Sequence, residues 1–272
     1  MPEASLGVIG GGVMGEALLS RLLDRGIFSP QAIWVSDPQA TRRQSLQASY
    51  GVHTTASNAE VIQQAQTILL AIKPQALAAV AQDFTDLSHS TTAPPLGLSI
   101  LAGVTLSRLA AACPGWVWVR AMPNTPATVG AGITALAAGP GVTADQLHQA
   151  RTIFACVGEV IEVPETLMDA VTALSGSGPG YLAVVIEALA DGGVAAGLPR
   201  AIALQLALQT VKGTAELLQQ TDWHPAVLKD RVTSPGGTTI AGIAQLEAAG
   251  LRSALIEAVR TAHRRSMELG QL

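Results

Sequence analysis

The residues best suited to chemistry lie in one short segment near the carboxyl end, at 232–240. A Pro-Gly-Gly run at 235–237 breaks the chain, and Thr238 and Thr239 then open a segment with the apolar periodicity of a helix. Glycines let a backbone approach a ligand closely, and the first N–H groups of a helix have no partner within it. Together with the hydroxyls of Ser234, Thr238 and Thr239, this corner predicts a site for a small anion. A plain Ser/Thr helix cap is the alternative interpretation.

A glycine-rich turn near the amino end carries a second pattern. Gly10, Gly12 and Gly15 match G-x-G-x-x-G, follow the apolar run Leu6–Ile9 and precede a helical pattern. In that context the first glycine allows a tight turn, the second lets a pyrophosphate approach, and the third lets the helix pack on the strand. We therefore expect a dinucleotide to bind at this turn.

The run Ile33–Asp37 predicts the next strand, whose end contacts the adenosine ribose in dinucleotide-binding folds. Asp37 could accept a hydrogen bond from a 2′-hydroxyl, which favours NAD. Ser36 with Arg42 or Arg43 could instead hold a 2′-phosphate, which favours NADP. A solvated helix face is the alternative interpretation of the two arginines. These residues leave the choice of cofactor open.

Further polar and turn-forming residues follow predicted strands and point to the same crevice. Lys73 ends the apolar strand predicted at 67–72, and two prolines stiffen the loop at 122–126 after another strand. Asn58 stands at a predicted helix start, within a Ser-x-x-Glu sequence at 57–60 that has the form of a capping box. Ligands of parallel sheets bind at the carboxyl ends of the strands, so we place Lys73 on the cofactor side. A surface lysine before a turn is the alternative.

Alternating strands and helices must position these residues. We expect strands at 6–9, 33–37, 53–55, 67–72, 96–101 and 117–122, with single helices between them. Strands spaced by single helices predict a parallel, doubly wound sheet. The amino-terminal part is therefore expected to be an α/β, Rossmann-like dinucleotide-binding domain spanning residues 1–163.

The second half changes character. From Pro164 onward strand alternation ends, and helices are expected at 168–174, 181–196, 200–219 and 248–269. Apolar residues of the second and third of these helices spread round more than one face, and a bundle of this size has a limited interior. We therefore predict an all-α dimerisation and substrate domain at 164–272 and a homodimer. A higher assembly of dimers is left open.

Composition excludes several partners. The chain of 272 residues is 49% hydrophobic, 13% charged and 3% aromatic, with a formal net charge of -4. The acidic balance and scarce aromatic residues argue against nucleic acid or an anionic membrane surface. The amino end lacks the basic start of a signal peptide, and Cys113 and Cys156 sit in apolar surroundings without CxxC spacing. We expect a cytoplasmic protein with a small-molecule substrate, without a metal and without a membrane span.

Five motifs occur in an order that identifies a family resemblance. They are Gly10–Gly15, Ala71–Pro74, Ala121–Pro126, Ser175–Pro179 and Ser234–Thr239. Together they resemble pyrroline-5-carboxylate reductases, the enzymes of the last step of proline synthesis. The resemblance covers essentially the whole chain, and its last motif is highly specific. It implies a dinucleotide-binding domain followed by a helical dimerisation domain, and the reduction of L-1-pyrroline-5-carboxylate to L-proline with NADPH or NADH.

The resemblance also implies roles for particular residues. Substrate residues carry over to Ser234, Gly236, Gly237, Thr238 and Thr239. Cofactor residues, with Ser36 added from its place at the end of the second strand, are Gly10, Gly11, Gly12, Val13, Met14, Gly15, Ser36, Asn58, Ala71, Ile72, Lys73 and Pro74. We expect NADP as cofactor, with NAD as the alternative. One departure concerns this choice, because Asp37-Pro38 stands where the family often has an arginine that helps hold the 2′-phosphate.

The predicted reaction adds a hydride to an imine carbon and leaves a proton on nitrogen. A protonated imine is already electrophilic, so we expect neither a metal nor a strong base, and we assign the hydrogen bond to the ring nitrogen to the Thr239 hydroxyl. Two alternatives remain. A β-hydroxyacid dehydrogenase or another imine reductase typically lacks the motif at 234–239. A non-catalytic dinucleotide sensor would need only the first domain.

Overall fold

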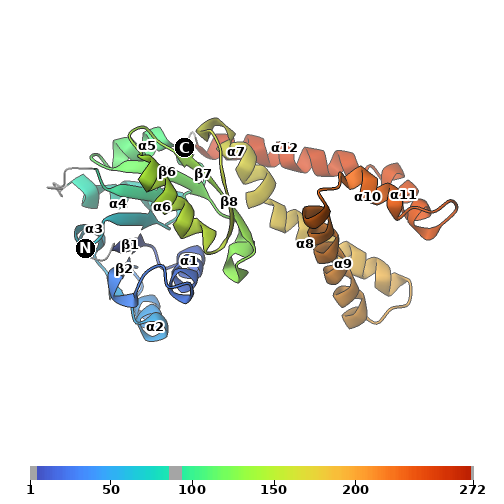
Figure 1. The fold of residues 1–272 in the computed structure, drawn as a ribbon, viewed down its shortest axis with the longest axis horizontal. Coiled ribbons are helices and arrows are strands. Elements are labelled where there is room, and N and C mark those ends of the chain that lie inside the picture. Colours follow the sequence, from blue (N-terminus) through green and yellow to red (C-terminus); the bar gives the residue numbers. More distant parts are fainter. Residues whose placement is uncertain (1–4, 86–93, 271–272) are drawn as a thin grey trace. The chain divides into compact units, whose positions relative to one another are not determined.

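The chain folds as two compact units in a computed structural model that describes residues 5–85 and 94–270. Unit 1 comprises Met1–Ser177 together with Ala262–Leu272, and unit 2 comprises Gly178–Thr261. Figure 1 shows the mixed sheet and helices of unit 1 and the helices of unit 2. The domain boundary expected between residues 163 and 164 stays a prediction.

Unit 1 is built on an eight-stranded sheet in the order β3-β2-β1-β4-β5-β6-β7-β8. The strands are β1 (Leu6–Ile9), β2 (Ile33–Ser36), β3 (His53–Thr55), β4 (Thr67–Leu70), β5 (Leu96–Ser99), β6 (Val117–Met122), β7 (Gly132–Ala138) and β8 (Gly158–Glu162). In the register of the sheet, Ile9 lies opposite both Ser36 and Leu70. The carboxyl ends of β1, β2 and β4 are therefore level, which brings their following turns together.

The predicted parallel sheet is confirmed with one exception. β6 and β7 pair antiparallel, with Met122 opposite Ala135. Only a short 3₁₀ helix, Thr125–Val129, separates the two strands, and so short a connection cannot carry the chain back to start a parallel neighbour. Asn124 Oδ1 accepts a hydrogen bond from the Ile133 N–H at 3.0 Å, which holds this loop closed. The six predicted strands all pair parallel, whereas β7 and β8 were not predicted from the sequence.

Helices cover both faces of the sheet. They are α1 (Val13–Asp24), α2 (Ala40–Tyr50), α3 (Asn58–Gln64), α4 (Leu77–Thr85), α5 (Leu106–Ala112), α6 (Ala144–Ala155) and the short α7 (Met168–Val171). One core cluster includes Leu18 of α1, Leu46 of α2 and Phe154 of α6. The other includes Ile62 of α3 and Phe84 of α4. Because helices cover both faces of the sheet, strands such as β4, which is buried at all of its positions, have nearly continuous apolar sequences.

Two helix starts with Ser or Thr caps differ in detail, and the one at 57–60 was predicted from the sequence. Thr143 and Gln146 form a complete capping box at α6. At α3, Ser57 Oγ accepts from the Glu60 N–H at 3.3 Å, but the Glu60 carboxylate does not accept from the Ser57 N–H as a capping box requires. It accepts instead from the Thr55 hydroxyl at 2.6 Å. The Ser57-x-x-Glu60 box is therefore only half formed, because Thr55 competes for the carboxylate.

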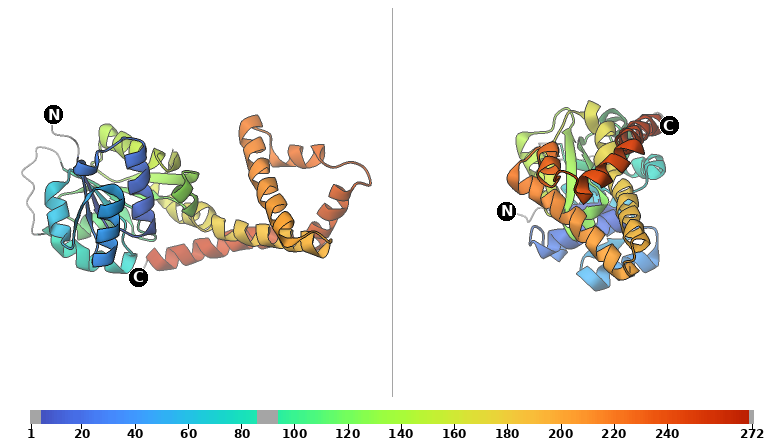
Figure 2. Two further views of the ribbon diagram at one scale, coloured as in Figure 1. Left: turned by 90° about the horizontal axis from the view of Figure 1, so that it is seen from below. Right: turned by 90° about the vertical axis from the view of Figure 1, so that its right-hand side faces the viewer.

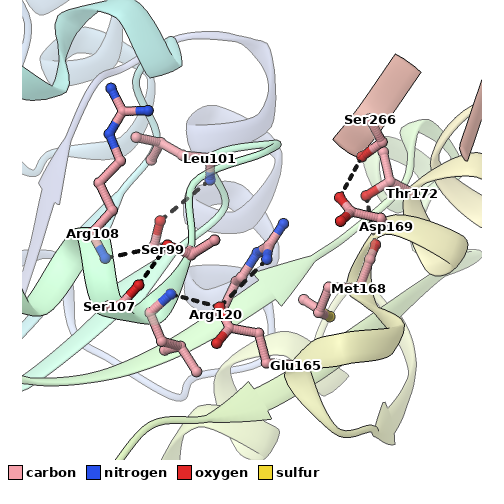
Figure 3. Close-up of polar contacts among 12 residues, drawn as sticks. Ser99, Leu101, Ser107, Arg108, Arg120, Glu165, Met168, Asp169, Thr172 and Ser266 are labelled. Carbon is pink, nitrogen blue, oxygen red and sulfur yellow. Dashed lines mark hydrogen bonds and ion pairs between the residues drawn. The ribbon is translucent and has the colours of Figure 1, made fainter. Parts of the chain in front are cut away.

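Polar contacts connect β6 to the 3₁₀ helix Glu165–Leu167, and α7 to the end of α12 (Leu251–Gly270) within unit 1 (Figure 3). Arg120 on β6 is 4% exposed, and its Nη1 lies 3.5 Å from Glu165 Oε1. The same carboxylate oxygen accepts from the Leu106 N–H at 2.6 Å. Asp169 Oδ1 accepts from the Ser266 hydroxyl at 2.7 Å. These contacts are consistent with the assignment of Ala262–Leu272 to unit 1.

Unit 2 is helical, as expected. It contains α8 (Gly178–Ala195), α9 (Arg200–Thr221), α10 (Pro225–Arg231), α11 (Thr238–Ala248) and the first part of α12. α8 and α9 pack against each other (Figure 2). The residues buried between them are Ala190, Ala203 and Ala207. The single helix predicted at 248–269 is wrong at its start, because Gly250 adopts a φ of +74° and separates α11 from α12.

α8 and α9 leave many apolar side chains uncovered in the single chain. Seven large ones are 43–65% exposed: Leu182, Val184, Leu189, Ile202, Leu204, Leu206 and Leu208. Such a surface typically marks an interface. By length and composition alone, the helical run Glu165–Ala195 could also cross a membrane, but one such helix is weak support for a membrane span.

Candidate active site

The β1–α1 turn has the geometry that a dinucleotide requires. Gly10 adopts a φ of +102°, and a Cβ added there would lie 2.5 Å from the Ala71 carbonyl oxygen. A Cβ at Gly15 would lie 2.4 Å from the Gly10 carbonyl oxygen, whereas one at Gly12 would meet nothing within 4 Å. The first and third glycines therefore allow close packing, and the second borders open space. Gly12 is the N-cap of α1 and has no side chain that could cap the helix. The first backbone N–H groups of α1 can therefore donate to a pyrophosphate.

A cleft of about 340 Å³ opens beside this turn in unit 1. It is lined by Gly12, Val13, Met14, Ala71, Ile72, Lys73, Ile100, Met122 and Pro123. The structure thus brings together the glycine turn, the end of β4 and the loop after β6, which the sequence predicted to share one crevice. The sequence prediction did not include Ile100 among the crevice residues. Its position directly after β5 could have identified it, because ligands bind where parallel strands end.

Ser36 and Asn58 meet at the end of β2, next to the cleft-forming turns. Ser36 is 1% exposed, and its hydroxyl donates to Asn58 Oδ1 at 2.7 Å. Asn58 Nδ2 in turn donates to Asp83 Oδ2 at 2.9 Å. Ser57 is the N-cap of α3 and Asn58 follows it, so the amide does not serve as the helix cap. These bonds fix its orientation, while its role toward a cofactor stays a prediction.

Gly11 and Pro74 lie outside the residues that line the cleft. The Gly11 N–H donates to the Asp37 carboxylate at 3.0 Å, which places it on the side of the turn toward β2. Pro74 starts the 3₁₀ helix Pro74–Ala76 directly after Lys73. Lys73 is exposed and projects from the end of β4. Their contact with a cofactor remains an expectation.

The glycine–threonine turn of unit 2 forms a helix start with unused donors. Gly236 adopts a φ of +66°, and the Gly237 N–H donates to the Ser234 carbonyl at 3.0 Å. A Cβ at Gly237 would lie 2.4 Å from Ser234 Oγ, so a larger residue there would displace the serine side chain. Gly237 is the N-cap of α11 and supplies no side-chain cap. The first N–H groups of α11 therefore lack the usual side-chain acceptor.

The hydroxyls around this turn are also unused. Throughout 5–85 and 94–270, no residue hydrogen-bonds the side chains of Ser234, Thr238 or Thr239. Thr239 is half-buried, whereas Ser234 and Thr238 are exposed. The alternative interpretation of this segment, a Ser/Thr helix cap, does not describe the structure. The turn offers N–H donors and hydroxyls in one place, as binding of a carboxylate with a second polar group requires.

Thiol chemistry does not fit the described sites. Cys113 and Cys156 are buried and free of disulfides, and burial raises the pKa of each thiol to about 12. Both thiols are therefore protonated at neutral pH and are poor nucleophiles. Within the described ranges, no group of three His, Cys, Asp or Glu side chains is placed to hold a metal ion.

Comparison with known proteins supplies the family. Residues 165–269 match a family model described as pyrroline-5-carboxylate reductase dimerisation, and residues 5–93 match one described as NADP oxidoreductase, coenzyme F420-dependent. A pyrroline-5-carboxylate reductase from Synechocystis is 57% identical over 98% of both chains.

Two solved structures extend the likeness to the fold of the whole chain. A pyrroline-5-carboxylate reductase from Coxiella burnetii is 35% identical, with a TM-score of 0.91 and 98% of each chain covered. A pyrroline carboxylate reductase from Plasmodium falciparum, solved with NADP bound, is 29% identical, with a TM-score of 0.87 and 99% of each chain covered. With its two glycine-rich turns and a full-length relative at this identity, the chain belongs to the pyrroline-5-carboxylate reductase family.

Proposed function

We propose that this chain reduces L-1-pyrroline-5-carboxylate to L-proline with NADPH or NADH, the last step of proline biosynthesis. The observation that carries this conclusion is the 57% identity to a pyrroline-5-carboxylate reductase over 98% of both chains. The two turns support it, since one fits a dinucleotide and the other fits a small carboxylate. A dinucleotide sensor would leave the second turn unexplained.

The cofactor supplies the hydride when it is bound in unit 1. The N-terminus of α1 and the turn Gly10–Gly15 would hold the pyrophosphate, because Gly12 borders open space and the helix has no side-chain cap. Val13, Met14, Ala71, Ile72 and Lys73 would line the space for the rest of the dinucleotide. Ser36, Asn58, Gly11 and Pro74 complete the proposed set. NADP is bound in the structure of the Plasmodium relative, and NADH is the proposed second donor here.

The turn of unit 2 would bind the substrate. The N–H groups of Thr238 and Thr239 lie at the start of α11, where the helix dipole favours a carboxylate. Gly236 permits the turn through its positive φ. The free hydroxyls of Ser234 and Thr238 would donate to the carboxylate and fix its position.

Thr239 is proposed to act on the ring nitrogen. Thr239 is half-buried, and no described residue hydrogen-bonds its hydroxyl. The hydroxyl oxygen would accept a hydrogen bond from the N–H of the protonated imine and so orient the ring, and that proton stays on the nitrogen of the product amine. Most of the acceleration would come from holding the imine carbon in position for hydride transfer.

The exposed apolar surface of α8 and α9 fits a homodimer. It lies within residues 165–269, which match the dimerisation family, so subunit contact accounts for it without a membrane. A higher assembly of dimers and a cytoplasmic location are further parts of the proposal.

The test is steady-state oxidation of NADPH and NADH with and without the imine acid, with proline identified as product. We expect oxidation only when the imine acid is present. A related reductase would instead oxidise the cofactor with another substrate, and a sensor would bind the cofactor without turnover. Either outcome would overturn the proposed function.

A further inference from the structure

A carboxylate is locked beside the dinucleotide turn at the end of β2. Asp37 Oδ2 accepts from the Gly11 N–H at 3.0 Å, and Oδ1 accepts from the Gln39 N–H at 2.9 Å. A Cβ at Gly11 would lie 2.6 Å from Leu46 Cδ1 and 3.4 Å from Asp37 Oδ2. The carboxylate is therefore held against the turn, and each oxygen keeps a lone pair for a further donor.

Two arginines of α2 bond the backbone beside this carboxylate, and within residues 5–85 and 94–270 only Arg42 of the two forms an ion pair. Arg42 Nη2 lies 2.5 Å from Glu16 Oε2, and its Nε donates to the Gly11 carbonyl. Glu16 is further held by the Tyr50 hydroxyl, which donates to Oε1 at 3.2 Å. Arg42 is thus tied to the turn and paired with a carboxylate inside unit 1.

Arg43 has a different environment. Its Nη1 donates to the carbonyls of Asp37 and Pro38, at 2.7 and 3.0 Å. Carbonyl oxygens orient a guanidinium without cancelling its charge. Among the described residues no carboxylate pairs with Arg43, so its positive charge lies uncompensated beside Asp37 and its remaining guanidinium N–H groups can donate to an anion.

We infer that Asp37 and Arg43 act against each other in setting the cofactor preference. The Asp37 carboxylate accepts from the ribose hydroxyls of NADH and repels the 2′-phosphate of NADPH, whereas Arg43 pairs with that phosphate. Glu16 reinforces the first effect by holding Arg42 in an ion pair. This inference rests on the proposed use of NADPH and NADH, and it assigns the discrimination between them to named side chains.

The experiment measures dissociation constants of NAD⁺ and NADP⁺ by calorimetry, without substrate. In Asp37→Asn the amide oxygen can still accept from Gly11, so the turn keeps one bond while the charge is lost. We expect the preference for NADP⁺ over NAD⁺ to rise by about tenfold, because a like charge at close range is removed. Arg43→Gln should weaken NADP⁺ by about tenfold and change NAD⁺ by less than about threefold.

Asp145→Asn is the matched control, because it removes the same charge from the exposed first turn of α6. It should leave both constants unchanged. A preference that shifts less than about twofold in folded Asp37→Asn, or unaltered NADP⁺ binding in Arg43→Gln, overturns the inference. If Asp37→Asn fails to fold, Arg43→Gln decides alone. Because substrate is absent, a chain that shows these shifts yet fails to reduce the imine acid contradicts only the proposed function.

Discussion

The glycine turn of unit 1 yields a pair of substitutions whose effects should separate. Gly15→Ala places a methyl group 2.4 Å from the Gly10 carbonyl oxygen, a backbone atom that cannot swing away. Overpacking costs about 1–3 kcal/mol, and so short an approach to a backbone atom falls at the upper end of that range, at about 2–3 kcal/mol. Alanine recovers about 1 kcal/mol through its higher helix propensity. The net loss should be about 1–2 kcal/mol, which lowers Tm by roughly 2–8 °C in a chain of this size.

Gly12→Ala should behave in the opposite way. Nothing lies within 4 Å of a Cβ there, and the φ of −68° is one that alanine adopts readily. The stability should therefore change by less than about 0.5 kcal/mol. The methyl group would, however, occupy the space that the pyrophosphate needs, and the Kd for NADPH should rise by at least about tenfold, or 1.4 kcal/mol.

The assay combines thermal unfolding by circular dichroism with NADPH binding by calorimetry on both variants and the parent chain. Gly15→Ala should lose both stability and binding, because the turn itself must open. Gly12→Ala should lose binding alone. Unchanged stability in Gly15→Ala, or unchanged NADPH binding in Gly12→Ala, would refute the assignment of the two glycines.

Three further predictions concern other parts of the chain. Thr239→Ala should lower kcat by about 100-fold, with cofactor Kd and Tm unchanged, whereas Thr239→Ser should retain most activity; equal kinetics would remove Thr239 from the mechanism. Glu165→Ala should destabilise the chain by about 2–3 kcal/mol in urea unfolding, since it leaves the 4%-exposed Arg120 without its counter-charge; Glu165→Gln should cost less because it can still accept from the backbone. Burial raises the pKa of the Cys113 and Cys156 thiols to about 12, so both should resist a disulfide reagent at pH 8 until the chain is unfolded. The raised values also mean that each thiol favours the folded state below pH 9 and loses this contribution as the pH rises from 9 toward 12, which urea unfolding across that range measures.

The two glycine-rich turns were the parts of the site that the sequence predicted best, because glycine and proline restrict which backbone conformations are possible there. A glycine pattern after a strand predicts both the β1–α1 turn and its partner segments, because parallel strands end at one edge of the sheet. The positions of Ala71–Lys73 and Met122 beside that turn follow from the same rule. The α11 start was predictable for a similar reason, since Pro-Gly-Gly followed by Thr-Thr leaves few backbone conformations.

Other features depend on contacts that a sequence pattern does not encode. β7 is rich in alanine, which has weak strand propensity, and its direction is set by the short loop before it. The half-formed box at Ser57 depends on a competing hydroxyl two residues upstream. The pairing of Arg42 with Glu16 joins residues from two helices, so sequence alone could not separate the roles of Arg42 and Arg43.

Transfer of deuterium tests the central claim most directly. The chain would be incubated with the imine acid and NADPH carrying deuterium at C4 of the nicotinamide, using each of the two C4 diastereomers in turn. The account predicts proline with one deuterium on the former imine carbon from one diastereomer and unlabelled proline from the other. Proline without deuterium from both, or no proline at all, would contradict it.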